Sequence, residues 1–206
     1  MNARASTAGY AEQAEKLIAR YESVAPEEVH EAVVHLIPHA PCRALDIGAG
    51  SGRDANWLAA KGHDVVAVEP TAQMRHAGMR LHPNPRIEWI DDGLPDLRAL
   101  ANCEPFELIM LTAVWQHLDA NERARAMPRV AELAKPGAIL AMLLRHGPVP
   151  EGRRMFQVTA DETAALAAEA GFVVLVNTTR RAIRGDAPSG VTWTSLAFRR
   201  APNTAM

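Results

Sequence analysis

Three glycines in five positions follow an apolar segment and could bring a ligand against bare backbone. They lie in Asp46-Ile47-Gly48-Ala49-Gly50-Ser51-Gly52-Arg53, after a short β-type run at 43–47 and before a helical run that begins at Asp54. Glycine has no side chain, so a ligand can approach the main chain of such a turn closely. In open α/β sheets, ligands bind at the carboxyl ends of strands, which is where this turn falls. The alternative is a tight turn that binds no ligand.

The glycine spacing differs from the fingerprint of dinucleotide-binding proteins. That fingerprint is G-x-G-x-x-G, and a match starting at Gly48 would need glycine at the position held by Arg53. The spacing present is G-x-G-x-G. The turn therefore disfavours an NAD-dependent oxidoreductase.

An acidic residue ends the next predicted strand, within Glu69-Pro70-Thr71-Ala72-Gln73-Met74. A carboxylate can accept hydrogen bonds from two hydroxyl groups at once, and such charge-assisted bonds are about twice as strong as neutral ones. Glu69 is thus a candidate for binding a diol. A solvated carboxylate at a strand end is the alternative.

Together, these two segments resemble the motifs of class I S-adenosylmethionine-dependent methyltransferases. Asp46-x-Gly48-x-Gly50-x-Gly52 is similar to motif I of that family, and the segment at Glu69 fits its second-strand pattern D/E-x-S/T-x-x-M. The resemblance implies that S-adenosylmethionine is the cofactor, that S-adenosylhomocysteine is the product, and that the acid takes both ribose hydroxyls. The cofactor-binding residues expected here are Asp46, Gly48, Ala49, Gly50, Gly52, Glu69 and Pro70.

Two later segments complete the cofactor site that the resemblance implies. Asp91 and Asp92 follow the third predicted strand, where the family has a carboxylate that receives the adenine amino group. A turn made by Asp-Asp-Gly is the alternative for either residue. Thr112 and Val114, after the fourth predicted strand, are expected to line the methionine part of the cofactor.

Arg145 and His146 end the fifth predicted strand and are the candidate catalytic residues. Histidine can remove a proton from a hydroxyl or amine near neutral pH, and arginine can hold an anionic substrate group through a two-pronged contact. A histidine in a loop turn is the alternative for His146. Arg153 and Arg154 follow in the next loop, either as further positive charge at an acceptor pocket or as a solvated pair.

Three aromatic or imidazole side chains have two interpretations each. Trp115 lies either near the sulfonium or in the core, and His117 is expected to pack and bond locally. In related enzymes, an amino-terminal helix folds over the cofactor mouth and sometimes contributes a tyrosine. Tyr10 or Tyr21 is a candidate for that place.

The elements that must position these residues alternate between two hydrophobic periods. β-type runs at 43–47, 65–68, 87–90, 106–111 and 138–144 are separated by helical runs at 54–61, 71–80 and 121–134. This βαβ rhythm predicts a doubly wound, parallel α/β sheet. A helix at 161–170 follows, then strands at 172–178 and 191–198, which are expected to pair antiparallel because loop 180–190 is too short for a crossover helix. The resemblance implies a Rossmann-like seven-stranded sheet in the order 3-2-1-4-5-7-6, with the last strand antiparallel.

The amino-terminal part reads as a separate helical cap. Apolar residues recur at helical spacing from Tyr10 to Ile37, and Pro26 begins a second helix. Pro38 and Pro41 then stop helical structure. We expect a cap at 1–41 and a methyltransferase core at 42–206, forming a single domain overall.

Composition excludes several classes of partner. The 206 residues carry 22 Lys and Arg against 24 Asp and Glu, a net charge of −2, which lacks the field needed for nonspecific binding to DNA. No apolar stretch reaches the roughly 20 residues that span a bilayer, and the amino terminus lacks a secretory signal, so a cytoplasmic location is expected. Pro38 between His35 and His39 argues against a metal site.

These observations predict a methyltransferase that works by in-line displacement on a small-molecule acceptor, because no target-recognition domain accompanies the core. The alternatives are methylation of RNA or protein, and a noncatalytic module that binds or senses the cofactor. The sequence leaves open whether the chain forms a homodimer.

Overall fold

The computed structural model describes residues 7–181 and 190–202, and within them one seven-stranded sheet has the order β3-β2-β1-β4-β5-β7-β6. Its strands are β1 (Arg43–Ile47), β2 (Asp64–Val68), β3 (Ile87–Ile90), β4 (Phe106–Thr112), β5 (Ala134–His146), β6 (Phe172–Arg181) and β7 (Thr192–Arg200). The strands from β3 to β5 pair parallel, whereas β7 pairs antiparallel with both β5 and β6. The predicted order and the antiparallel last strand are confirmed.

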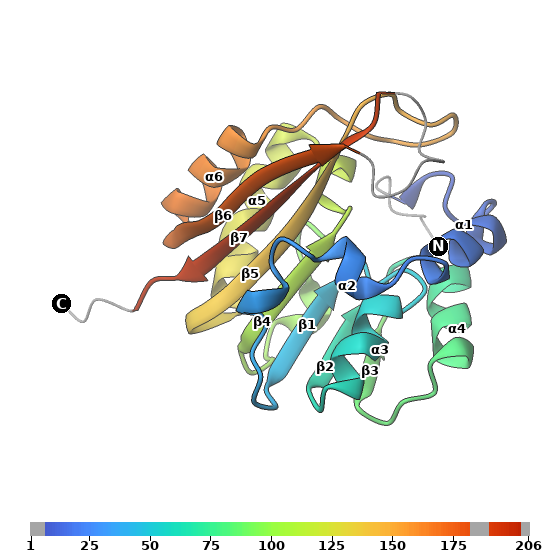
Figure 1. Cartoon of the computed structure of the whole chain (residues 1–206), viewed down its shortest axis with the longest axis horizontal. Helices are drawn as coiled ribbons and strands as arrows, with labels where there is room; N and C mark the ends of the chain where they lie inside the picture. Colours follow the sequence, from blue (N-terminus) through green and yellow to red (C-terminus); the bar gives the residue numbers. More distant parts are fainter. Residues whose placement is uncertain (1–6, 182–189, 203–206) are drawn as a thin grey trace.

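Helices cover both faces of this sheet (Figure 1). The crossover helices are α3 (Arg53–Ala60), α4 (Ala72–Leu81), α5 (Ala120–Glu132) and α6 (Ala160–Glu169), with 3-10 turns η3 (Arg98–Leu100) and η4 (Trp115–His117). A capping box begins α5, because Asp119 accepts the Glu122 backbone N–H at 2.9 Å and Glu122 accepts that of Asp119 at 2.8 Å.

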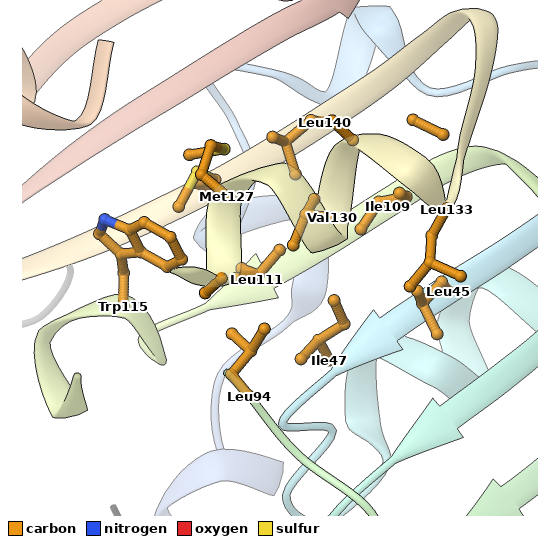
Figure 2. Close-up of a cluster of buried hydrophobic side chains, with 14 of the residues drawn as sticks. Leu45, Ile47, Leu94, Ile109, Leu111, Trp115, Met127, Val130, Leu133 and Leu140 are labelled. Carbon is orange, nitrogen blue, oxygen red and sulfur yellow. The ribbon is translucent and has the colours of Figure 1, made fainter. Parts of the chain in front are cut away.

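The largest apolar cluster lies between the sheet and α5. Figure 2 shows Leu45, Ile109, Leu140 and Val130 meeting there, with Trp115 at one end of the cluster. A second cluster packs α3 against the opposite face of the sheet. Since both faces are buried, the strands read as nearly continuous apolar runs, as in other parallel sheets.

The amino-terminal segment forms α1 (Ala14–Glu22), α2 (Pro26–Val29) and the 3-10 turn η2 (Val34–Leu36). Figure 1 shows α1 beside α4, at the edge where the parallel strands end. The second predicted helix begins at Pro26 but stops after one turn. Directly after it, His30 is buried and bonded to α3, which a continued helix would not allow.

Two strands differ from their predicted form. β5 starts at Ala134 rather than Ala138, and its register with β4 shifts between Phe106 and Leu108. β6 is the last strand of the sheet and carries a bulge between Val174 and Val176. Within the described ranges, no helix has the length and hydropathy needed to cross a bilayer.

Candidate functional site

The glycine turn after β1 folds back on β2, and its glycines place no side chains over its backbone. Gly48 and Ala49 donate their N–H groups to the Val68 carbonyl at 2.7 and 3.0 Å. Gly48 has a φ of +72°, and a Cβ added there would lie 2.5 Å from Val114 Cγ2. Only glycine fits this position, because any side chain would be strained and would collide with Val114.

Glu69 stands beside this turn and is bonded to it. Its side chain accepts the Gly50 N–H at 2.9 Å through Oε2 and the Thr71 N–H at 2.8 Å through Oε1. Glu69 is only 6% exposed, and burial raises the pKa of its carboxyl against the opposing effect of these hydrogen bonds. The Thr71 side chain also bonds to this carboxylate, so one of its about four acceptor positions stays open. Pro70, half-buried, follows at the strand end.

Asp46 lies at the carboxyl end of β1, beneath the turn. It is 1% exposed, and its Oδ2 has no hydrogen-bond partner within the described part of the chain. Burial, with the nearby charge of Asp54 second, raises the pKa of the Asp46 carboxyl well above its usual value. Asp46 is thus a buried acid with one free acceptor directly below the glycines.

A buried cluster of polar side chains surrounds Asp54, and it was not predicted from the sequence. Asp54 Oδ2 accepts from His30 Nε2 and from Thr112 Oγ1, each at 2.9 Å, while Arg53 Nε donates to Oδ1 at 2.7 Å. His30 and Arg53 hold the pKa of the Asp54 carboxyl far below its usual range despite burial. The cluster ties the cap, α3 and the end of β4 together. Thr112, predicted to line the cofactor, is one of its members.

The two acidic residues after β3 have different surroundings. Asp92 is buried, and its oxygens accept the Gly93 N–H at 2.8 Å and the Ala99 N–H at 2.7 Å, as in the Asp-Asp-Gly turn alternative. The side chain of Asp91 is 64% exposed and pairs with Arg75 at 3.1 Å. Arg75 also donates to the Glu69 carbonyl at 2.6 Å. Arg75 therefore joins Asp91 to the strand end that carries Glu69.

Two neighbouring residues of the turn after β4 have different surroundings, one at the glycine turn and one in the core. Val114 packs against Gly48 in the glycine turn, and its expected place beside the methionine part of the cofactor stays a prediction. Trp115 is fully buried in the main core, which settles its two interpretations in favour of packing (Figure 2).

Arg145 and His146 point to opposite faces of β5, as neighbours in a strand must. The His146 Nε2 atom lies 2.8 Å from Thr194 Oγ1 on β7, and the ring also bonds to the Val158 backbone. Burial lowers the pKa of His146. The structure therefore does not bring His146 together with the glycine turn and Glu69. Arg145 lies on the other face, within electrostatic range of Tyr10.

Two tyrosines of the cap close over the site. Tyr21 lies above the glycine turn, with ring carbons 3.6 Å from where a Gly50 Cβ would be. The Tyr10 hydroxyl lies 2.9 Å from His117 Nε2, and His117 Nδ1 lies 2.8 Å from the Arg154 carbonyl. Since a carbonyl only accepts, Nδ1 carries the proton and Nε2 accepts from the tyrosine. Glu69 acts electrostatically on both phenols, so they share one site with it.

The cap is fixed to the core at several further points. Glu22 accepts from Ser51 Oγ in the glycine turn, and Arg53 donates to the Tyr21 carbonyl at 3.2 Å. On the other side, the guanidinium of Arg153 stacks on Tyr10, 3.8 Å from the ring centroid. Among the described residues, no group of three or more His, Cys, Asp or Glu side chains could hold a metal ion.

Taken together, the sheet order and the acid beside a glycine turn define a class I S-adenosylmethionine-dependent methyltransferase fold. Residues 44–137 match the family described as "Methyltransferase domain". This match covers a little under half of the chain. The fold is shared with solved S-adenosylmethionine-dependent methyltransferases.

Three curated proteins similar to this chain are named as uncharacterized methyltransferases. An uncharacterized methyltransferase of Mycobacterium bovis is 29% identical over 134 residues, which cover 61% of this chain and 49% of the relative. The chain thus spans about half the length of the curated relatives it matches.

Two solved structures share the fold at low sequence identity. The 1,6-didemethyltoxoflavin-N1-methyltransferase of Burkholderia thailandensis, with 1,6-didemethyltoxoflavin and S-adenosylhomocysteine bound, is 18% identical. The match covers 92% of this chain and 89% of that one, with a TM-score of 0.68. A Haemonchus contortus N-methyltransferase in complex with phosphomonomethylethanolamine and S-adenosylhomocysteine is 16% identical, with coverage of 85% and 53% and a TM-score of 0.67.

Proposed function

We propose that this chain is a methyltransferase that uses S-adenosylmethionine and methylates a small-molecule acceptor. The observation that carries the proposal is the hydrogen bond from the Gly50 N–H to the Glu69 carboxylate at 2.9 Å. It joins a diol-binding acid and a bare glycine turn in one site at the carboxyl ends of β1 and β2, where α/β sheets bind nucleosides.

The residues present fit the proposed cofactor. The Glu69 carboxylate keeps an acceptor position for a ribose hydroxyl beside its bonds to Gly50 and Thr71, and the buried Asp46 keeps a free Oδ2 below the glycines. Asp91 is the better placed of the two acids after β3 to meet an adenine amino group, because both Asp92 oxygens already bind backbone N–H groups. Val114 would line the methionine end beside Gly48.

The cofactor would supply a methyl group on a positively charged sulfur, already activated for displacement. What this chain would contribute is alignment, which can supply about 7 kcal/mol or more of the acceleration. Tyr10 and Tyr21 exclude water from above the glycine turn. Burial lowers the pKa of His117, so its Nε2 is a neutral acceptor near pH 7.

A small acceptor is favoured because the cap covers the site. Arg153 stacks on Tyr10 and donates to Gln13, so it fixes the cap over this side of the site, where a polymer strand would have to enter. The two solved structures hold small molecules beside S-adenosylhomocysteine, 1,6-didemethyltoxoflavin and phosphomonomethylethanolamine. We also propose that residues 1–41 form a cap and residues 42–206 the methyltransferase core. The proposed location is the cytoplasm.

Calorimetric titration tests the proposal. The chain should bind S-adenosylhomocysteine with a measurable Kd and bind NAD far more weakly. Turnover is then measured with tritiated S-adenosylmethionine against a metabolite library. Preference for NAD would contradict the cofactor, and tight S-adenosylhomocysteine binding without any methylated small molecule would favour the noncatalytic or macromolecular alternatives.

A further inference from the structure

Two arginine side chains lie at the Tyr10–His117 pair without a carboxylate partner. They are Arg145 from the end of β5 and Arg153 from the loop that follows β5. In the part of the chain that the structure describes, no acidic oxygen forms an ion pair with either of them. Uncompensated cations are costly where they are partly withdrawn from water, so their grouping needs an explanation.

Arg153 is held in place but not neutralised. Its guanidinium stacks on the Tyr10 ring, its Nη2 donates to Gln13 Oε1 at 3.0 Å, and its buried Nε has no partner among the described residues. The neighbouring Arg154, by contrast, is paired with Asp119 at 3.1 Å and Glu122 at 2.8 Å. Arg154 is therefore neutralised by two carboxylates, whereas Arg153 has no acidic partner among the described residues.

Arg145 is similarly placed by neutral groups. Its Nη2 donates to the Pro148 carbonyl at 2.9 Å, and its Nη1 lies 3.9 Å from the Met155 sulfur. A guanidinium has five N–H donors, so several remain unused. Met155 follows Arg153 by two residues, and the Arg145 backbone N–H lies 3.5 Å from Oε1 of Gln116, the neighbour of His117. In keeping with this placement, the charges of Arg153 and Arg145 lower the pKa of His117, after burial. The positive charges therefore act on one common region.

We propose that Arg145 and Arg153 bind the anionic group of the methyl acceptor, a carboxylate or a phosphate monoester, beside the Tyr10–His117 pair. Planar guanidinium groups bind both anions in a two-pronged fashion. This proposal rests on the proposed function, because it names the acceptor class of the same site. Arg145 and Arg153 belong to β5 and the loop after it, two strands from β1 and three from the Glu69 strand end, which leaves the nucleoside side to Glu69 and Asp91.

The anion could instead be the carboxylate of the cofactor's own amino acid, so the experiment separates these sources. Protein saturated with S-adenosylhomocysteine is unfolded thermally across a series of inorganic phosphate concentrations, against potassium chloride of equal ionic strength. A ligand of the folded state raises the Tm in a concentration-dependent manner, which yields a Kd for phosphate. In a second arm, S-adenosylhomocysteine is compared with methylthioadenosine, which lacks the carboxylate.

The variants are Arg145→Gln, Arg153→Gln and, as a matched control, Arg86→Gln. Arg86 pairs with Asp64 at the opposite edge of the sheet and is half exposed. We expect phosphate affinity to fall about tenfold on loss of either Arg145 or Arg153, as for one charged hydrogen bond, and to be unchanged in the control. Affinity for S-adenosylhomocysteine should stay as in the wild type. If Arg145→Gln fails to fold, Arg153→Gln carries the test, because Arg153 lies in the loop after β5 and not in the sheet.

Two results would overturn the proposal. One is a phosphate response that is equal in the wild type and all variants. The other is a loss of S-adenosylhomocysteine affinity in the variants while methylthioadenosine binding is unchanged, which would assign the arginines to the cofactor. A wild-type chain that binds neither nucleoside would instead contradict the proposed function itself.

Discussion

The Glu69 carboxylate accepts the backbone N–H of Gly50 across the mouth of the site at 2.9 Å. An acid on one strand end thereby fixes the turn that follows another. This arrangement orders the glycine turn before any ligand arrives. It also makes Glu69 both a support for the turn and the group that would meet the ribose.

Replacing Glu69 should weaken nucleoside binding. We expect Glu69→Ala to raise the Kd for S-adenosylhomocysteine by about 10- to 100-fold, the loss of charged hydrogen bonds. Calorimetry on the folded variant measures this. Glu88→Ala on the exposed part of β3 is the control and should bind normally. An unchanged Kd in Glu69→Ala would remove Glu69 from the site.

The pH dependence of that binding should follow Glu69. Burial raises its carboxyl pKa above the usual 4.5, so protonation begins at a higher pH than for an exposed glutamate. A protonated carboxyl accepts fewer hydrogen bonds, and the Kd should therefore rise as the pH falls through the raised pKa. Glu69→Gln carries no such titration, so its Kd should vary less over the same range. Parallel curves for the two proteins would assign the effect to another group.

Gly48 should be far less replaceable than another glycine with the same backbone conformation. Gly48 and Gly137 have φ values of +72° and +82°, but a Cβ at Gly137 meets nothing within 4 Å. Alanine at either position costs about 1–2 kcal/mol of backbone strain. At Gly48 we expect a further cost of about 1–3 kcal/mol from overpacking against Val114. Urea denaturation measures the difference, and Val114→Ala should restore part of it; equal costs at the two glycines would contradict this account.

Breaking the Asp54 cluster should destabilise the chain strongly. Removing one partner of a buried ion pair typically costs about 3–5 kcal/mol, so we expect a loss of this size for Asp54→Asn near neutral pH. Asp64→Asn breaks a surface pair with Arg86 and should cost about 1 kcal/mol or less.

The same cluster predicts a pH dependence of stability. The pKa of Asp54 is lowered in the folded state, so its contribution is fully present above the usual carboxyl value of 3.8 and is lost as the pH falls through the lower folded value. The difference in unfolding free energy between the wild type and Asp54→Asn should therefore become smaller as the pH falls below 3.8. A gap that widens there would have the wrong sign for this interpretation.

His146 should prove to be a residue that stabilises the fold and takes no part in turnover. Its ring bonds Thr194 and the Val158 backbone, so His146→Ala should lower the unfolding free energy by about 1–3 kcal/mol. Turnover per folded molecule should be retained, with His146→Gln recovering part of the stability. A loss of kcat in a fully folded variant, with an altered pH profile, would instead restore the proton-transfer role predicted from the sequence.

Most of the fold was predictable because parallel strands buried on both faces appear as short apolar runs. The bounds predicted for β1 and β3 coincide with the observed ones. The same property hid the orientation of the residues at the end of β5. Since Ala138 to Leu144 is apolar throughout, no alternation showed which face of the sheet Arg145 occupies and which His146.

The candidate site was predictable where it is local in sequence. The glycine turn and Glu69 belong to segments with a recognisable spacing, and the structure brings them into contact. The Asp54 cluster joins His30 and Thr112, which lie 24 and 58 residues away along the chain. Such pairings depend on tertiary packing and leave no periodic signal. The only local cue was a charged residue at the start of a helix that has one buried face.

The bulge in β6 also affects how this chain would behave at high concentration. The unpaired peptide groups of an edge strand can form hydrogen bonds with a strand of another chain. In β6, the exposed apolar side chains of Val173, Val174 and Leu175 would favour such an association. The extra residue between Val174 and Val176 interrupts the regular spacing of those groups and increases the local twist. We therefore expect a second molecule to align along only a short stretch of β6, so that a concentrated solution of this protein resists fibrillar aggregation.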